Sequence, residues 1–254
     1  MRILEVNALR KVYTTRFGDQ PVEALRAVTF TVDQGDYVAV MGESGSGKTT
    51  LLNILAALDR PTSGQVLLEG RDLTKVKESD MAAFRRDHLG FVFQDFNLLD
   101  TFTLEDNIYL PLVLAGKKYP EMHRALLPLA EELGITALLK KYPYEVSGGQ
   151  KQRAAVARAL ITRPQVLFAD EPTGALDSGS TEELLRLFGT VNGAGQTIVM
   201  VTHSVRAASC AGRVLFLRDG AVAQEITRGT DTETAFYRRI ADVLTASQTG
   251  GGAA

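Results

Sequence analysis

The chain has 254 residues, enough for one or two domains with a large buried core, and 45% of them are apolar while 23% are charged. This is ordinary globular composition, which excludes a disordered, collagen-like or coiled-coil chain. Lys and Arg (28) nearly balance Asp and Glu (30), for a net charge of -2, whereas a general nucleic-acid-binding protein has a clear basic excess. We therefore expect no nucleic-acid partner.

The sequence also limits where the protein works. Its one cysteine, Cys210, cannot form an internal disulfide, and we expect it to be a small buried residue in a reducing, cytosolic compartment. Residues 1–13 lack the apolar core and cleavage site of a signal peptide, and no apolar run reaches the roughly 18 residues that span a bilayer. Any association with a membrane is therefore expected to come through a protein partner.

The first predicted elements are strands. Val28, Phe30 and Val32 alternate with other residues as in a half-buried antiparallel strand, and the run 37–41 is typical of a buried strand. Further apolar runs are separated by segments long enough for helices, which is the pattern of a parallel α/β sheet. These runs are 66–68, 89–93, 166–169, 198–201 and 214–217.

Strand patterns disappear between about residues 104 and 141. There the spacing predicts helices over 105–114 and 121–133, and a later helix is expected over 150–160. We therefore expect an α/β core with an N-terminal antiparallel β-subdomain and an inserted helical subdomain over about 96–160. All of it is assigned to one domain, residues 1–246, and the segment 247–254 has too little apolar surface to pack and is predicted to be a disordered tail.

Residues 42–49, here called the phosphate loop, match G-x-x-x-x-G-K-[ST] between the buried strand and a helix predicted over 50–58. The glycines let successive N–H groups converge on phosphate oxygens, and the positive end of the helix attracts the same anion. Lys48 adds a charge for the β- and γ-phosphates, and the Thr49 hydroxyl is a ligand for Mg²⁺. A plain glycine-rich turn is disfavoured by these flanks, and a dinucleotide loop needs glycine where Thr50 stands. The predicted nucleotide-binding residues are Gly42, Ser44, Gly45, Ser46, Gly47, Lys48, Thr49 and Thr50.

Two carboxylates, Asp170 and Glu171, end the apolar run 166–169. Neighbouring side chains at a strand end point apart. We therefore expect Asp170 to bind Mg²⁺ and Glu171 to act as the general base for the water that attacks the γ-phosphate. Alone, such a pair is more often an exposed turn, but beside a phosphate loop the catalytic interpretation is favoured.

Residues 146–150, here called the signature, resemble the L-S-G-G-Q signature of the ATP-binding subunits of ATP-binding-cassette (ABC) transporters. From the residues alone, Ser147 caps a helix whose glycine-rich start offers N–H groups to an anion. The motifs occur in the family's order, and the resemblance covers about residues 1–228. It implies a P-loop NTPase (RecA-like) fold, ATP and Mg²⁺ as ligands, and a dimer in which the signature of one copy closes on the ATP of the other. The signature residues implied to contact nucleotide are Ser147, Gly148, Gly149 and Gln150.

The resemblance also implies roles for isolated residues. By it, His203 contacts the γ-phosphate and Gln94 senses Mg²⁺ and water. Asp177 couples the two sites across the dimer, and Tyr13 stacks on adenine. Phe17 is a rival for stacking, because stacking needs only a flat π-face. The resulting catalytic set is Glu171, His203 and Lys48, and the metal set is Thr49, Gln94 and Asp170.

Two positions depart from the family's usual pattern. Val146 stands where leucine is usual, a conservative exchange that should leave the helix end intact. Ser204 follows His203 where aspartate is frequent, which puts the orientation of the histidine in doubt, although serine can also form a hydrogen bond. Neither departure removes a catalytic group.

Further segments narrow the resemblance within the family. Residues 91–100, 169–178 and 213–220 resemble the branch of macrolide exporters, lipoprotein-releasing complexes and peptide-resistance transporters. Residues 97–103, 141–151 and 168–172 are most similar to bacitracin-type peptide-resistance ATPases. The resemblance implies an integral membrane permease and a second copy of the chain as partners, on the inner face of the cell membrane. We place the groove for a permease helix over 95–114, with core packing as the rival explanation for its apolar residues Phe96, Leu98, Leu99 and Phe102.

Alternative functions remain open at this stage. The same ATPase chemistry serves macrolide-export, lipoprotein-release or cell-division-type complexes, and ATP binding can act mainly as a signal to a partner. A soluble ABC protein of DNA repair or translation is disfavoured, because those proteins need a long coiled-coil insertion or tandem cassettes that this length does not accommodate.

Overall fold

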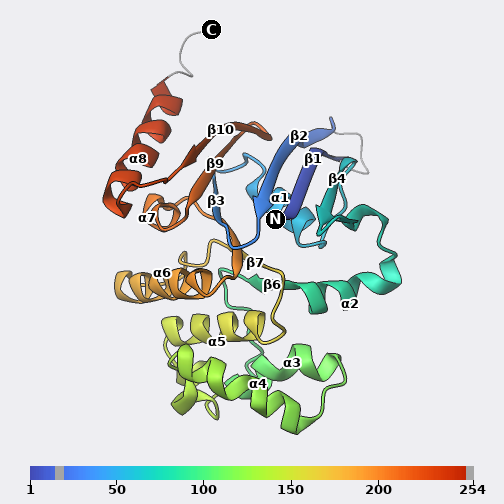
Figure 1. Ribbon diagram of the computed structural model, residues 1–254, viewed down its shortest axis with the longest axis vertical. Coiled ribbons are helices and arrows are strands. Elements are labelled where there is room, and N and C mark those ends of the chain that lie inside the picture. Colours follow the sequence, from blue (N-terminus) through green and yellow to red (C-terminus); the bar gives the residue numbers. More distant parts are fainter. Residues whose placement is uncertain (15–19, 250–254) are drawn as a thin grey trace.

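The computed structural model describes residues 1–14 and 20–249, with side chains for 1–14 and 20–246. Within these residues the strands form two sheets (Figure 1). The first sheet is antiparallel throughout. An antiparallel sheet can bury one face and expose the other, which agrees with the alternating pattern predicted for residues 28–32. In spatial order its strands are β2 (Val22–Asp33), β1 (Arg2–Tyr13), β4 (Ser63–Leu68) and β5 (Arg71–Asp72).

The second sheet contains the parallel core. In spatial order its strands are β10 (Ala221–Thr227), β9 (Arg213–Arg218), β3 (Tyr37–Met41), β8 (Thr197–Val201), β7 (Val166–Asp170) and β6 (Leu89–Val92). Every neighbouring pair is parallel except β9 with β10. Strands β3 and β8 are buried along their whole length because both faces of the sheet are covered, which explains their continuous apolar sequences.

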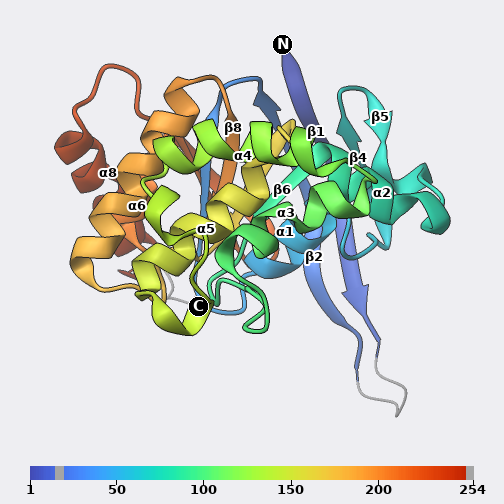
Figure 2. The ribbon, with the colours of Figure 1, turned by 90° about the horizontal axis from the view of Figure 1, so that it is seen from below.

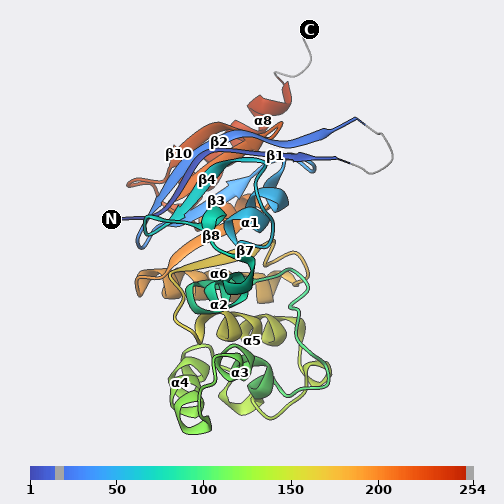
Figure 3. The same cartoon turned by 90° about the vertical axis from the view of Figure 1, so that its right-hand side faces the viewer.

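Helices cover both faces of the parallel sheet. A separate layer is made of α3 (Leu104–Leu114), α4 (Tyr119–Glu132) and α5 (Gly148–Leu160). It lies at the end farthest from the antiparallel sheet, as Figure 3 shows, and it faces the viewer in Figure 2. Within that layer α5 contacts α3, and it also contacts α6 and β6 of the core. The other helices are α1 (Lys48–Leu55), α2 (Glu78–His88), α6 (Ser178–Gly193), α7 (Val205–Ser209) and α8 (Glu233–Thr249), with short 3₁₀ turns η1 (Leu73–Lys75), η2 (Thr136–Leu138) and η3 (Pro143–Glu145).

The hydrophobic core is divided by the parallel sheet. Along β3, Val38 and Val40 pack into the cluster that contains α1 and the antiparallel sheet. The alternate residues Ala39 and Met41 pack into the cluster that contains α5 and α6. Because successive side chains of a strand point to opposite faces of the sheet, β3 contributes to both clusters. Because β3 and β7 lie in this core, the loops that follow them start from fixed points.

The structure confirms the predicted strands and helices with three corrections. Residues 66–68 do not join the parallel sheet, because they belong to β4, which pairs antiparallel with β1. The helix after the phosphate loop spans Lys48–Leu55 rather than 50–58, since Ala57 has a left-handed φ of 55°. Helix α8 continues to Thr249, so the backbone of 247–249 is helical where a disordered tail was predicted, and residues 250–254 lie outside the described residues. The assignment of 1–246 to one domain stays a prediction.

Among the residues that the structure describes, no helix has both the length and the apolar character of a membrane span.

Candidate nucleotide site

The phosphate loop connects the buried end of β3 to the start of α1. Gly47 is the N-cap of α1 and has a φ of 99°, and a Cβ there would lie 2.4 Å from the carbonyl oxygen of Ala24 in β2. A Cβ on Gly42 would lie 2.3 Å from the carbonyl oxygen of Leu217 in β9. Only glycine fits both positions, so the loop backbone is held tightly against two neighbouring strands.

The phosphate loop borders a cavity of about 440 Å³, which lies within the range of small-molecule sites. Beside it, the Ser46 hydroxyl is buried and has no hydrogen-bond partner among the described residues. The cavity brings the three predicted catalytic side chains together with the loop. Its lining residues are Val22, Glu23, Ala24, Ser44, Gly45, Gly47, Lys48, Thr49, Thr50, Glu171 and His203.

Lys48 folds back over the loop that precedes it. Its Nζ donates hydrogen bonds to the carbonyl oxygens of Gly42 and Glu43, both at 2.7 Å. Burial lowers the pKa of Lys48, while the charges of Glu171 and Asp170 oppose that change. The ammonium group is thus held at the cavity by neutral carbonyls, which leaves its charge available to an anion.

The two carboxylates after β7 have different surroundings. Burial raises the pKa of Asp170, and the neighbouring charge of Glu171 adds to this rise while Lys48 opposes it. Glu171 accepts a hydrogen bond from the backbone N–H of His203 at 3.2 Å, and its other oxygen lies 2.9 Å from His203 Nδ1. The φ of Glu171 is 44°, a left-handed value that is costly outside glycine and concentrates at functional sites. A cation would relieve the crowded charge of Asp170, whereas Glu171 is already engaged by histidine.

Tyr13 lies at the end of β1, outside the residues that line the cavity. Its hydroxyl donates to Asp59 Oδ2 at 2.8 Å, and Lys11 Nζ sits 4.7 Å above its ring. Burial raises the pKa of Tyr13, and a hydrogen bond with Thr50 opposes the rise, which places the ring beside α1. Adenine stacking by Tyr13 stays a prediction, and its rival Phe17 lies outside the described residues.

Gln94 lies two residues after the end of β6, and it too lies outside the cavity lining. Its side chain packs over Gly174, where a Cβ would lie 3.0 Å from Gln94 Cδ. The Gly174 N–H donates to the carbonyl oxygen of Glu171 at 2.9 Å. Gln94 therefore contacts the turn that follows the second carboxylate.

The signature lies apart from this cavity, at the start of α5 in the helical layer. The Ser147 hydroxyl accepts from the Gln150 N–H at 3.3 Å, and Gln150 Oε1 accepts from the Ser147 N–H at 3.0 Å, which makes a capping box. Gly149 packs so closely on α6 that a Cβ would lie 2.6 Å from Ser180 Oγ. None of the signature residues lines the cavity. One chain therefore has two separate helix starts that suit an anion.

Asp177 caps α6, the helix against which the signature packs. Its carboxylate accepts from the Ser180 N–H at 3.0 Å and from the Ser180 hydroxyl at 2.7 Å. These hydrogen bonds lower the pKa of Asp177, so it stays ionised. Ser180 thus contacts both Asp177 and Gly149, which brings two predicted dimer-contact segments together.

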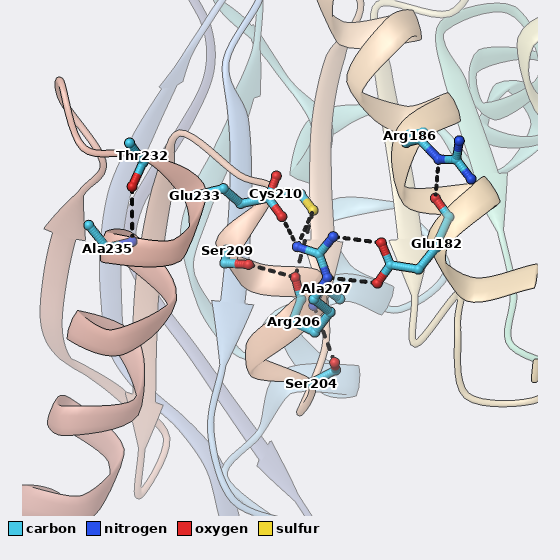
Figure 4. A network of polar contacts seen from close by, with 10 residues as sticks. All are labelled: Glu182, Arg186, Ser204, Arg206, Ala207, Ser209, Cys210, Thr232, Glu233 and Ala235. Carbon is cyan, nitrogen blue, oxygen red and sulfur yellow. Dashed lines mark hydrogen bonds and ion pairs between the residues drawn. The ribbon is translucent and has the colours of Figure 1, made fainter. Parts of the chain in front are cut away.

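Arg206, three residues after His203 in the chain, links three helices (Figure 4). Its guanidinium donates to both carboxylate oxygens of Glu182 in α6, at 2.7 and 2.6 Å, and pairs with Glu233 at the start of α8. Arg206 itself belongs to α7, whose N-cap Ser204 accepts from the Ala207 N–H at 3.2 Å. The serine that departs from the family pattern thus caps the helix that follows His203.

Comparisons with known proteins decide the family. A family model described as ABC transporter matches residues 25–174. The chain is 47% identical over 252 residues to the ABC transporter ATP-binding protein YxdL of Bacillus subtilis, which covers 99% of this chain and 96% of that protein.

The chain belongs to the ABC transporter family.

Two further similarities extend this assignment. The bacitracin export ATP-binding protein BceA of Halalkalibacterium halodurans is 45% identical over 241 residues, 94% of each chain. A dimeric post-hydrolysis structure of the ATP-binding cassette MJ0796 with ADP and Pi matches with a TM-score of 0.80 at 35% identity, over 89% of this chain and 98% of that one. The predicted family and its P-loop NTPase fold are confirmed.

Within this ABC cassette, the structure brings some predicted residues together and separates others. The phosphate loop, Glu171 and His203 share one cavity, whereas the signature and Asp177 lie outside it. Sequence analysis missed residues 22–24 of β2, which line the cavity because β2 packs against Gly47. It also missed Arg206, whose partners are distant in the chain. No local pattern marks either feature, because both depend on tertiary packing.

Proposed function

We propose that this chain is the ATP-hydrolysing subunit of a membrane transporter, and that two copies close on ATP. The observation that carries the proposal is the separation of two anion-binding helix starts, one at the cavity and one at Ser147. A head-to-tail pair of chains places the second start of one copy opposite the cavity of the other. The dimeric MJ0796 structure with ADP and Pi supports this arrangement.

The residues of the cavity, together with neighbouring side chains outside its lining, fit a nucleoside triphosphate with Mg²⁺. Lys48 and the amides of the phosphate loop bind phosphate oxygens, and Tyr13 stacks on the base. Burial and the charge of Glu171 raise the pKa of Asp170, which means that its ionised carboxylate is destabilised. A bound cation would offset this destabilisation, so Asp170 suits the role of a metal ligand. Thr49, Gln94 and Asp170 are the proposed metal ligands, and Mg²⁺ supplies charge neutralisation at the phosphates when bound.

Glu171 is the proposed general base. A positioned carboxylate that takes a proton from water contributes roughly 10²- to 10⁴-fold to a rate. His203, which contacts both Glu171 oxygens through its backbone N–H and Nδ1, is the proposed γ-phosphate contact. Movement of His203 to the phosphate frees Glu171 to accept the proton. The cap that Ser204 makes on α7 fixes the backbone from which His203 projects.

The proposed setting is the cytoplasmic face of a membrane, where the chain binds an integral membrane permease. Leu99 and Phe102 are 47% and 39% exposed, in the segment 95–114 that we predict as the docking groove. Exposed apolar side chains of this kind suit a permease helix. Similarity to BceA over 94% of both chains supports bacitracin-type peptide resistance as the process served.

Substitution of the proposed base tests this function. Glu171→Gln should keep ATP affinity, lower the rate of phosphate release at least about hundredfold, and accumulate dimers with ATP in analytical ultracentrifugation. Glu121→Gln, which makes the same change at an exposed position of α4, should hydrolyse ATP like the wild type. Unchanged phosphate release in Glu171→Gln would remove that residue from its role, and monomers at saturating ATP would contradict the dimer.

A further inference from the structure

The loop that carries Gln94 has an unusual backbone. Phe96 and Asn97, two consecutive residues, have left-handed φ values of 60° and 49°. Residues with a Cβ rarely adopt this conformation, and it persists where surrounding contacts leave the chain no alternative. Contacts that hold it here come from α5, the helix that begins at the signature.

Arg158 of α5 holds the left-handed pair directly. Its Nη2 donates to the carbonyl oxygen of Phe96 at 2.9 Å, and its Nη1 donates to the carbonyl oxygen of Asn97. Both hydrogen bonds have a charged donor, which makes them stronger than bonds between neutral groups. One guanidinium therefore fixes two successive peptide units in the same unfavourable conformation.

Gln152, also in α5, holds the other end of the loop. It is completely buried, and its Nε2 donates to the carbonyl oxygens of Phe93 at 3.3 Å and Pro172 at 2.7 Å. Phe93 precedes Gln94, and Pro172 follows Glu171. A single buried amide thus joins the segment before Gln94 to the segment after the proposed base.

The loop also approaches the signature itself. A Cβ added to Gly148 would lie 3.7 Å from the Phe96 ring, in ordinary van der Waals contact, so nothing separates that ring from the start of α5. On its other side, Gln94 packs over Gly174 in the turn after Glu171. A continuous chain of contacts therefore leads from Gly148 through residues 93–97 to that turn.

We propose that Gln152 and Arg158 are positioning residues, which fasten the Gln94 loop and the turn after Glu171 to the signature helix. Engagement of the signature by a second copy then displaces Gln94 and the proposed base together with α5. This inference rests on the proposed function, because it assigns to these side chains the link between dimer closure and hydrolysis. Neither residue contacts the cavity, so ATP binding to one chain does not depend on them.

Matched substitutions on α5 test the inference in the full-length chain. Arg158→Met and Gln152→Met remove the polar contacts at similar side-chain length. The control is Arg153→Met, which removes a guanidinium from the same helix. That guanidinium pairs with Glu183 in α6 and not with the loop. Hydrogen exchange of the amides of residues 93–97, measured without nucleotide, should accelerate at least about tenfold in Arg158→Met and stay unchanged in the control.

Kinetics give the second readout. Both loop variants should lower kcat about tenfold and leave KM for ATP within about twofold, whereas the control keeps both constants. Arg158→Lys retains one charged donor and should recover part of the exchange protection and part of kcat. If Gln152→Met does not fold, the Arg158 pair of variants carries the test alone.

The outcomes separate the two proposals. Unchanged exchange at 93–97 in Arg158→Met would overturn the inference, as would a kcat equal to that of the control. A wild type and control that hydrolyse no ATP would instead refute the proposed function, while the exchange result would still report whether α5 holds the loop.

Discussion

The two helix starts differ in how completely one chain prepares them for an anion. At α1, the N-cap Gly47 has no side-chain cap, and the loop before it borders a cavity with Lys48 and His203. At α5, Ser147 and Gln150 cap each other, Ser147 is exposed, and none of the signature residues lines the cavity that the phosphate loop borders. In the proposed function, one chain thus supplies one complete phosphate site and one half-site. The half-site becomes useful only against another molecule.

The largest expected difference is in nucleotide affinity. Lys48→Ala removes an ammonium group held at the cavity, and the loss of charge-assisted hydrogen bonds to phosphate should cost about 3 kcal/mol, roughly hundredfold in Kd. Ser147→Arg alters the other helix start and should leave the Kd of the isolated chain unchanged. Isothermal titration calorimetry with ATP measures both, and equal losses in the two variants would contradict the comparison.

The glycines of the two sites should respond differently to an added methyl group. Gly47→Ala meets the backbone of Ala24 in a left-handed conformation, so the free energy of unfolding should fall by about 2 kcal/mol or more. Gly149→Ala instead meets the side chain of Ser180. Chemical denaturation should therefore show that Gly149→Ala costs less stability in a Ser180→Gly background than in the wild type, although Ser180→Gly itself loses the hydrogen bond to Asp177. An equal cost of Gly149→Ala in both backgrounds would mean that the Ser180 side chain does not limit how closely the signature packs on α6.

A smaller effect concerns the charge of the cavity. The folded pKa of Asp170 is raised, so its ionised form destabilises the nucleotide-free protein above that pKa, and the penalty disappears as the pH falls through it. Asp170→Asn should raise Tm by roughly 2 °C at pH 8. The gain should shrink as the pH falls from 8 through the raised pKa of Asp170, because protonated Asp170 is also neutral. Thermal denaturation across this range checks the sign, and a gain that grows on acidification would show that the carboxylate is stabilising.

The smallest effect is expected for the Arg206 network. Its side chains are 40% to 44% exposed, and exposed ion pairs contribute about 0.2–1 kcal/mol. A double-mutant cycle with Arg206→Met and Glu182→Gln should give a coupling energy in this range, reduced in 1 M salt. A coupling above about 2 kcal/mol would show that this network, rather than core packing, fixes α6 against α7.

Sequence patterns predict best what is contiguous in the chain. The phosphate loop and the pair Asp170–Glu171 are short segments after buried strands, and the structure places them at the ends of β3 and β7. Periodicity could not assign residues 66–68 to the right sheet, because an apolar run does not reveal its partner strand. In the structure, burial alternates along the second half of β4, as expected for a strand with one covered face.

Long-range contacts could not be predicted in the same way. Arg158 reaches carbonyl oxygens about 60 residues earlier in the chain, and Gln152 joins two loops that are distant in sequence. A side chain that binds backbone carbonyls leaves no residue pattern at the other end, since every residue has a carbonyl group. Such positions become visible only once the fold is known.

A complementation assay tests most directly whether two copies form each ATP site. Lys48→Ala and Ser147→Arg chains are each expected to be inactive in phosphate release. In a mixed head-to-tail dimer, one site carries both defects and the other carries none, so an equimolar mixture should recover about a quarter of the wild-type rate. A mixture no faster than the sum of its two components would contradict the account.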